Sequence, residues 1–151
     1  MPFSKITISH ICEECNMTRK SFYYHFRDKN DLISWIFSTE FLSLANEKHY
    51  DDSFSFLLDL CRYLEENNSF YSKILIHDDQ NSFSKQFENI IFTNMQTIFE
   101  DDENHNFCTE FFSAAVIISI KKWLLEQKSL SPEKFVSLIK LSIHGITKTT
   151  N

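Results

Sequence analysis

Hydrogen-bond donors are concentrated in one short segment near the start of the chain. Residues 18–25 hold no acidic side chain, and the donors there and just beyond are Thr18, Arg19, Lys20, Ser21, Tyr23, Tyr24, His25 and Lys29. A short helix of donors that follows a tight turn fits the major groove of double-stranded DNA. Arginine and lysine can bind guanine edges, serine and threonine can reach bases or phosphates, and tyrosine hydroxyls suit phosphates. The segment therefore predicts contact with nucleic acid.

A pair of cysteines in the same region offers a second kind of chemistry. Cys12 and Cys15 have the spacing of a thioredoxin-like or zinc-binding pair, and His10 lies nearby. No second Cys or His pair follows at zinc-finger spacing, and the other histidines are scattered. We therefore expect both cysteines to be buried structural thiols, and we expect neither a metal site nor a cofactor.

The scarcity of glycine excludes several classes of enzyme. Phosphate-binding loops, dinucleotide fingerprints and nucleophile elbows each need several glycines, whereas this chain of 151 residues has one, Gly145. The acidic groups Asp51-Asp52, Asp78-Asp79 and 100–103 fall at predicted helix ends and turns, where solvated charge is ordinary. We do not expect an enzyme.

Hydropathy and charge indicate a cytoplasmic protein whose charge is unevenly distributed. The longest apolar stretch, residues 111–120, is too short for the ~20 residues of a membrane span, so we expect no membrane partner. The net charge is −6, yet residues 1–29 hold five Lys or Arg against three Asp or Glu, and residues 30–151 hold ten against eighteen. This pattern suits a protein in which only the first part approaches a polyanion, although short windows also fluctuate by a few charges.

Helical patterns cover nearly the whole chain. Apolar residues recur at helical spacing, and Ser, Thr, Asn and Asp stand at the expected starts and turns. The predicted helices span residues 8–15, 19–26, 29–49, 53–66, 70–76, 82–99, 106–127 and 132–144, with caps at Thr7, Thr18, Asp28 and Ser131, a left-handed turn at Asn16 and a stop at Gly145. The predicted fold class is all-α: a helix-turn-helix head on a helical bundle.

The same residues resemble a known family. Phe22-Tyr23-Tyr24-His25-Phe26 followed by Lys29 and Leu32, within residues 6–32, look like the helix-turn-helix of TetR-type transcriptional regulators. Phe111-Phe112, Lys121-Lys122-Trp123-Leu124 and Ser131-Pro132-Glu133 are similar to the C-terminal region of the dihydroxyacetone-kinase-activator-like branch of that family. The resemblance implies base contacts by Thr18, Arg19, Lys20 and Ser21, contacts with the DNA backbone or flanking bases by Tyr23, Tyr24 and His25, a phosphate contact by Lys29, and a small core of Ile11, Phe22 and Phe26.

The chain departs from the family pattern in two places. Cys15 and Asn16 stand where the family usually has alanine and glycine in the turn. The family also places a whole helix before the equivalent of Ile6, where this chain has five residues, so we expect the first helix to be absent. Either the true start lies upstream of Met1 or DNA binding is weakened. The expected domains are a truncated DNA-binding head, residues 1–28, and a helical domain for ligand or partner binding and dimerisation, residues 29–151.

The predicted helix over residues 106–127 indicates how the chain assembles. Between Phe111 and Trp123 its apolar residues cover nearly the full circumference, so both sides of the helix should be buried. We expect a second subunit to supply part of this cover in a four-helix interface, formed by Phe112, Val116, Ile120, Trp123, Phe135 and Ile139; the alternative is a central core helix in a monomer. A two-fold dimer places its two heads one DNA turn apart, or a multiple of it, and so predicts a palindromic operator.

The sequence thus leads to two hypotheses of different classes. The first is a homodimeric regulator of transcription that binds an operator and responds to a small-molecule effector or a coactivator protein. The alternative is a helical, dimerising interaction module that has lost DNA binding. A phenylalanine-rich pocket is compatible with both hypotheses, and ligand-binding residues are not assigned.

Overall fold

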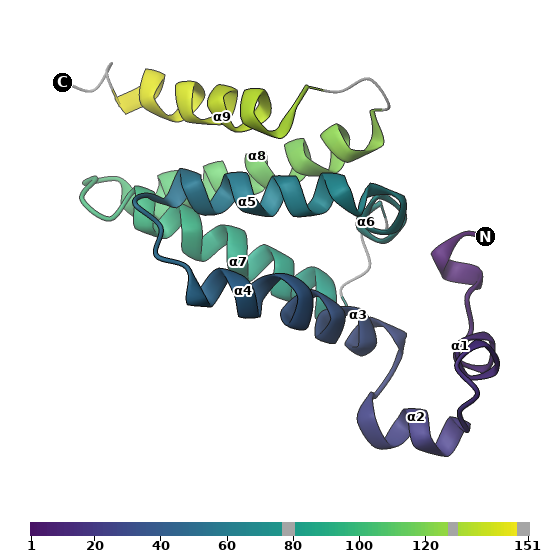
Figure 1. Ribbon diagram of the computed structural model, residues 1–151. Helices are drawn as coiled ribbons and strands as arrows, with labels where there is room; N and C mark the ends of the chain where they lie inside the picture. Colours follow the sequence, from purple (N-terminus) through teal and green to yellow (C-terminus); the bar gives the residue numbers. More distant parts are fainter. Residues whose placement is uncertain (77–80, 127–129, 148–151) are drawn as a thin grey trace.

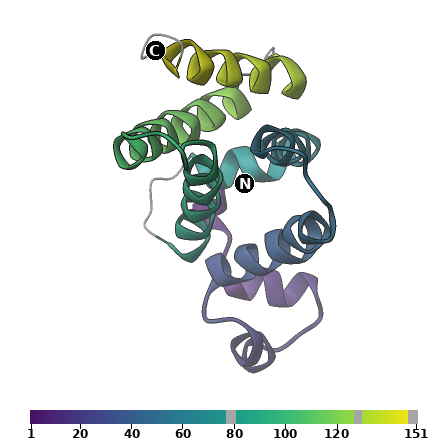
Figure 2. The same cartoon turned by 90° about the vertical axis from the view of Figure 1, so that its left-hand side faces the viewer.

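The computed structural model describes residues 1–76, 81–126 and 130–147, and every regular element in these ranges is a helix. Two short α-helices lie at one end of the molecule, and the remaining helices pack in layers (Figures 1 and 2). The all-α fold predicted from the sequence is confirmed. Of the helices in these ranges, none combines the length and the apolar character that crossing a bilayer needs.

The head begins with a single 3-10 turn, η1 (Phe3–Lys5), followed by α1 (Ile8–Glu14) and α2 (Arg19–His25). Both α-helices start at the predicted caps, because the Oγ1 atoms of Thr7 and Thr18 each accept a hydrogen bond from a backbone N–H of the first turn. Asn16 has a φ of 52°, which confirms the predicted left-handed turn between the two helices.

A long helix connects the head to the body. It consists of α3 (Lys29–Phe37), the π-helical segment η2 (Ser38–Leu42) and α4 (Ser43–Glu47), and the backbone stays right-handed helical through both junctions. We call this continuous element the linking helix. Asp28 caps its start, as predicted, by accepting a hydrogen bond from the Asp31 N–H at 2.9 Å. The π-helical segment was not predicted.

The body contains five further helices. They are α5 (Ser53–Glu66), α6 (Asn68–Leu75), α7 (Ser82–Ile98), α8 (His105–Leu125) and α9 (Pro132–Thr147). Their boundaries follow the prediction to within two residues where these are described, with one exception at the C-terminal end. The prediction that Gly145 stops the last helix is wrong, because α9 continues through Gly145 with a negative φ.

The body is layered around an aromatic core. In Figure 1, α9 lies over α5 and α8, and α7 packs against both α8 and the linking helix. The helix α5 also contacts the linking helix directly, for example through Tyr63 and Phe41. The core side chains are almost completely buried and include Phe37 from the linking helix, Leu57 from α5, Tyr71 from α6 and Phe83 from α7. The linking helix is therefore part of the body core and also carries the head at its N-terminal end.

Candidate DNA-binding head and regulatory body

The second helix of the head has one buried side and one exposed side. Phe22 is 1% exposed and packs against Phe26, with ring centroids 5.5 Å apart, and Phe26 in turn contacts Trp35 of the linking helix, with centroids 5.8 Å apart. Of the predicted contact residues, Ser21 is half-buried and the others on the helix are exposed, Tyr24 most of all at 85%. The structure therefore brings Arg19, Lys20, Ser21, Tyr23, Tyr24 and His25 together on one small helix, as the sequence predicted.

Two of these side chains also have contacts inside the head. The Arg19 guanidinium donates to the Ser9 hydroxyl at 3.2 Å and lies 6.0 Å from the centre of the Tyr23 ring. Thr18 caps α2 by accepting from the Ser21 N–H at 3.1 Å, which leaves the Thr18 hydroxyl proton available to donate. Ser9 was not singled out from the sequence, because a serine in a helix gives no signal of which side chain it will orient.

Lys29 is placed differently from the other predicted DNA contacts. Its Nζ atom donates to the carbonyl oxygens of Phe3 and Ile6, both at 2.9 Å, and to that of Ser4 at 3.4 Å. The ammonium also lies 4.4 Å from the centre of the Phe3 ring. All three ammonium protons are thus used within the chain, and a phosphate contact would require Lys29 to leave these carbonyls.

The two cysteines of the head have different environments. Cys12 is buried in the small core, as expected, whereas Cys15 is exposed at the end of α1, which corrects the expectation for that residue. Within the described ranges, no group of three or more His, Cys, Asp or Glu side chains is arranged to hold a metal ion.

The residues predicted to form the dimer interface lie inside the chain. Phe112, Val116, Ile120, Trp123 and Phe135 are buried in the core and Ile139 is half-buried against it. The Trp123 and Phe135 rings stack with centroids 4.8 Å apart and hold α9 against α8. We correct the predicted interface accordingly, because the four residues on α8 lie on the face that turns toward its own chain, and Phe135 and Ile139 of α9 pack into the same core.

The opposite face of α8 is apolar and exposed. It carries Phe107 at 70% exposure and also Phe111, Ile118 and Leu125. On α9, Leu138 and Leu141 are exposed as well. The helix is therefore apolar on both sides, as the sequence indicated, and one chain covers only one of them.

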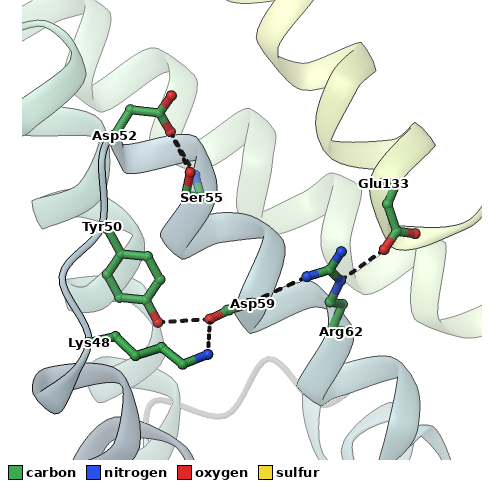
Figure 3. Close-up of polar contacts among 7 residues, drawn as sticks. All are labelled: Lys48, Tyr50, Asp52, Ser55, Asp59, Arg62 and Glu133. Carbon is green, nitrogen blue, oxygen red and sulfur yellow. Dashed lines mark hydrogen bonds and ion pairs between the residues drawn. The ribbon is translucent and has the colours of Figure 1, made fainter.

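A chain of polar contacts connects the end of the linking helix with α5 and α9 (Figure 3). Asp59 of α5 accepts hydrogen bonds from Lys48 Nζ at 2.8 Å and from the Tyr50 hydroxyl at 3.0 Å. Arg62 lies 3.7 Å from the other Asp59 oxygen and donates through Nε to Glu133 of α9 at 2.8 Å. We call these five residues the Asp59 network.

The Asp59 network changes the pKa values of Asp59 and Tyr50. Burial alone would raise the pKa of Asp59, but Lys48, Tyr50 and Arg62 outweigh it and hold that pKa below its usual value. Burial and the hydrogen bond to Asp59 raise the pKa of Tyr50 to about 12. The carboxylate is therefore ionised and the phenol neutral at ordinary pH.

The π-helical segment of the linking helix is held on two sides. Glu40 accepts a hydrogen bond from the Tyr63 hydroxyl of α5 at 2.9 Å, and Tyr63 shares a second one with Tyr71 at 2.8 Å. On the other side, the Gln86 amide of α7 donates to the Ser38 hydroxyl at 2.7 Å. Both α5 and α7 are thus hydrogen-bonded to the helix that carries the head.

Comparison with known proteins agrees with this division into head and body. Residues 2–34 match a family model described as "Bacterial regulatory proteins, tetR family", and residues 51–145 match one described as "Transcriptional regulator C-terminal region". The chain is 36% identical over 92 residues to the HTH-type dhaKLM operon transcriptional activator DhaS of Lactococcus lactis subsp. lactis (strain IL1403). That match covers 59% of this chain and 49%, about half, of the relative.

A solved structure is similar over nearly the whole chain. The structure of a dihydroxyacetone kinase operon activator, DhaS, superposes with a TM-score of 0.71 at 26% sequence identity. The superposition covers 99% of this chain and 88% of that one. The similarity therefore includes the head, the linking helix and the body.

Proposed function

Because the chain belongs to the TetR family of bacterial transcriptional regulators, we propose that it binds operator DNA as a homodimer through α2. We further propose that a small-molecule effector or a partner protein bound to the body alters this binding. The relatives are regulators of transcription, in agreement with the prediction that the chain is not an enzyme. We assign DNA binding to residues 1–28 and regulation and dimerisation to residues 29–151, and we place the protein in the cytoplasm, where bacterial DNA lies.

The observation that carries the DNA-binding proposal is the exposed side of α2. A helix anchored by one buried phenylalanine and lined with exposed donors fits the major groove, and its lack of acidic residues avoids repulsion by phosphates. We propose Thr18, Arg19, Lys20 and Ser21 as base contacts and Tyr23, Tyr24 and His25 as contacts with the backbone or flanking bases.

A gel-shift experiment with the promoter region of the chain's own gene, at two salt concentrations, tests this proposal. We expect a shift at low salt that weakens as salt rises. Lys20→Ala should relax base preference, whereas Tyr23→Ala should weaken binding to all sequences. The absence of any shift at low salt would contradict the proposal and favour an interaction module that does not bind DNA.

We propose that the exposed apolar face of α8, together with the outer side of α9, is the dimer interface. So many large apolar side chains exposed on two helices are unusual on a monomer, and a second copy related by two-fold symmetry would cover them with the same residues. Sedimentation of the Phe111→Glu and Ile118→Glu variants tests this: both should shift the chain toward monomer, whereas Ser69→Glu, on the exposed side of α6, should not. A dimer that persists in both variants would contradict the assignment.

We also propose that the regulator activates an operon, because both relatives are named as operon activators. A reporter gene placed behind the chain's own promoter region should lose expression when the chain is deleted. A gain of expression would instead identify a repressor.

A further inference from the structure

An open groove runs between the linking helix, α5 and α7, with a volume of about 720 Å³. Leu42 of η2, Phe56 of α5 and Ile90 of α7 give it apolar walls. The other described residues that line it are polar and uncharged, apart from Lys85. Amide and hydroxyl groups beside apolar walls, with little charge, favour a neutral ligand that carries both polar and apolar surface.

Two amide side chains in this groove have unused acceptors. Asn94 is 8% exposed, and its Nδ2 atom donates to the Ser53 carbonyl oxygen at 2.9 Å. Gln86 donates through Nε2 to Ser38, as described above. Within the described part of the chain, Asn94 Oδ1 and Gln86 Oε1 have no hydrogen-bond partner, although both are buried. Each amide nitrogen already donates a hydrogen bond, so a rotation of the amide group by about 180° would break that hydrogen bond and would not leave both ends of the amide paired.

We propose that this groove binds a small hydroxyl-rich molecule, of the sugar or polyol class. Hydroxyl groups can donate to the two unused carbonyl oxygens, which small side-chain movements would bring to the groove surface. The C–H surface of the same molecule packs against Phe56, Leu42 and Ile90. A ligand with several charges would lose its hydration and gain one partner, Lys85, so the lining disfavours it.

The groove lies beside the linking helix, so a ligand bound in it could affect the position of the head. Gln86, which lines the groove, is hydrogen-bonded to Ser38 of the π-helical segment, and Leu42 of that segment forms one wall. π-helical turns inside α-helices frequently occur at functional sites. A ligand that draws Gln86 away from Ser38 therefore changes the helix that carries α2. This regulatory step rests on the proposed function, whereas binding in the groove does not.

Binding is tested on the full chain without DNA. The probes are D-glucose, D-ribose, glycerol and, as an apolar comparison, indole, measured by thermal shift and by saturation-transfer NMR. At about ten times the dissociation constant, a bound probe should raise the melting temperature by about 3 °C. We expect at least one hydroxyl-rich probe to bind and indole not to bind.

Two tryptophan variants locate the site. Thr93 is exposed on α7 and lines the groove, so Thr93→Trp should fill it and abolish the shift. Ser69→Trp, at an exposed position of α6 outside the groove, should leave the shift unchanged. The inference is overturned if no hydroxyl-rich probe binds, if only indole binds, or if Thr93→Trp leaves binding intact. If a probe binds but the chain does not shift DNA, the inference about the groove stands and the proposed function is rejected.

Discussion

In the head, residues 1–28 bury two side chains, Cys12 and Phe22, whereas the body buries aromatic and aliphatic residues from every helix between α3 and α9. The head depends on caps, one turn at Asn16 and a few anchors, and it leaves its polar groups exposed. The body depends on packing. A surface that binds DNA must remain exposed, so a small head cannot bury much of its own surface. The stability of the head therefore depends on the linking helix, which joins it to the body. The following changes test how separate the two regions are.

The largest expected effect comes from removing an anchor in each region. Phe22→Ala and Phe37→Ala each delete a buried aromatic ring, at a cost of about 3–5 kcal/mol. We expect Phe37→Ala to lower the melting temperature of the whole chain by about 10 °C. Phe22→Ala should instead unfold the head locally, weaken DNA binding about tenfold or more, and leave the melting of the body nearly unchanged.

Amide hydrogen exchange distinguishes these outcomes. In Phe22→Ala, protection should be lost in α1 and α2 and retained in α5 and α7. Tyr24→Ala, which removes an exposed ring, serves as a control that weakens DNA binding without loss of protection. Equal loss of protection in head and body would show that the two regions unfold as one unit.

A smaller effect is expected at the junction between the regions. Lys29→Met keeps the apolar stem but removes the ammonium that binds the carbonyls of Phe3, Ser4 and Ile6. Loss of these charge-assisted hydrogen bonds should cost about 1.5–3 kcal/mol of local stability, read as faster exchange in residues 3–11.

The salt dependence of DNA binding shows whether Lys29 also contacts phosphate. If it only holds the N-terminal segment, the slope of log affinity against log salt stays unchanged while affinity falls. A slope that decreases by about one unit would show that Lys29 leaves its carbonyls and binds a phosphate, as the resemblance implied.

The Asp59 network gives the stability of the body a pH dependence. The pKa of Asp59 is held below its usual value by Lys48, Tyr50 and Arg62, against the effect of burial. The ionised carboxylate therefore stabilises the folded state above about pH 4, and this stability is lost as pH falls through the depressed pKa. Asp59→Asn should cost about 1 kcal/mol at pH 7 and less at pH 3. Urea unfolding at both pH values measures this, and an equal cost at both would contradict an electrostatic role.

The sequence predicted the local features more reliably than the surfaces that packing selects. Thr7, Thr18, Asp28 and Asn16 act through neighbours within four residues, so their roles follow from residue type alone. The helix α8 has apolar residues around nearly its whole circumference, so its sequence pattern does not show which face packs against the other helices of the same chain. For that reason the interface was assigned to the buried face. Cys15 was misplaced for a similar reason, because exposure depends on how α1 packs.

Other features carried no sequence signal. The π-helical segment at Ser38–Leu42 has an ordinary helical sequence, and its geometry depends on partners in α5 and α7. Gln86 and Asn94 have the spacing of an ordinary polar surface, and only the packed structure shows that their carbonyl oxygens are buried. The position of Lys29 predicts a phosphate contact, whereas its three carbonyl partners come from a segment 23 or more residues earlier.

The smallest predicted effect concerns how the head orients Arg19, a proposed DNA contact. Ser9→Ala removes the hydroxyl that accepts from Arg19 and leaves the guanidinium held only by its position over Tyr23. An exposed hydrogen bond of this kind contributes about 0.5–1 kcal/mol, so neither the melting temperature nor non-specific binding should change measurably. We expect discrimination between the preferred base and its competitors to fall about threefold at the single operator position that Arg19 contacts, because a freer side chain gains less from correct geometry. Competition gel shifts with operators changed one base pair at a time measure this. Arg19→Ala should abolish discrimination at the same position, and a Ser9→Ala effect at any other position would contradict a role in orienting Arg19.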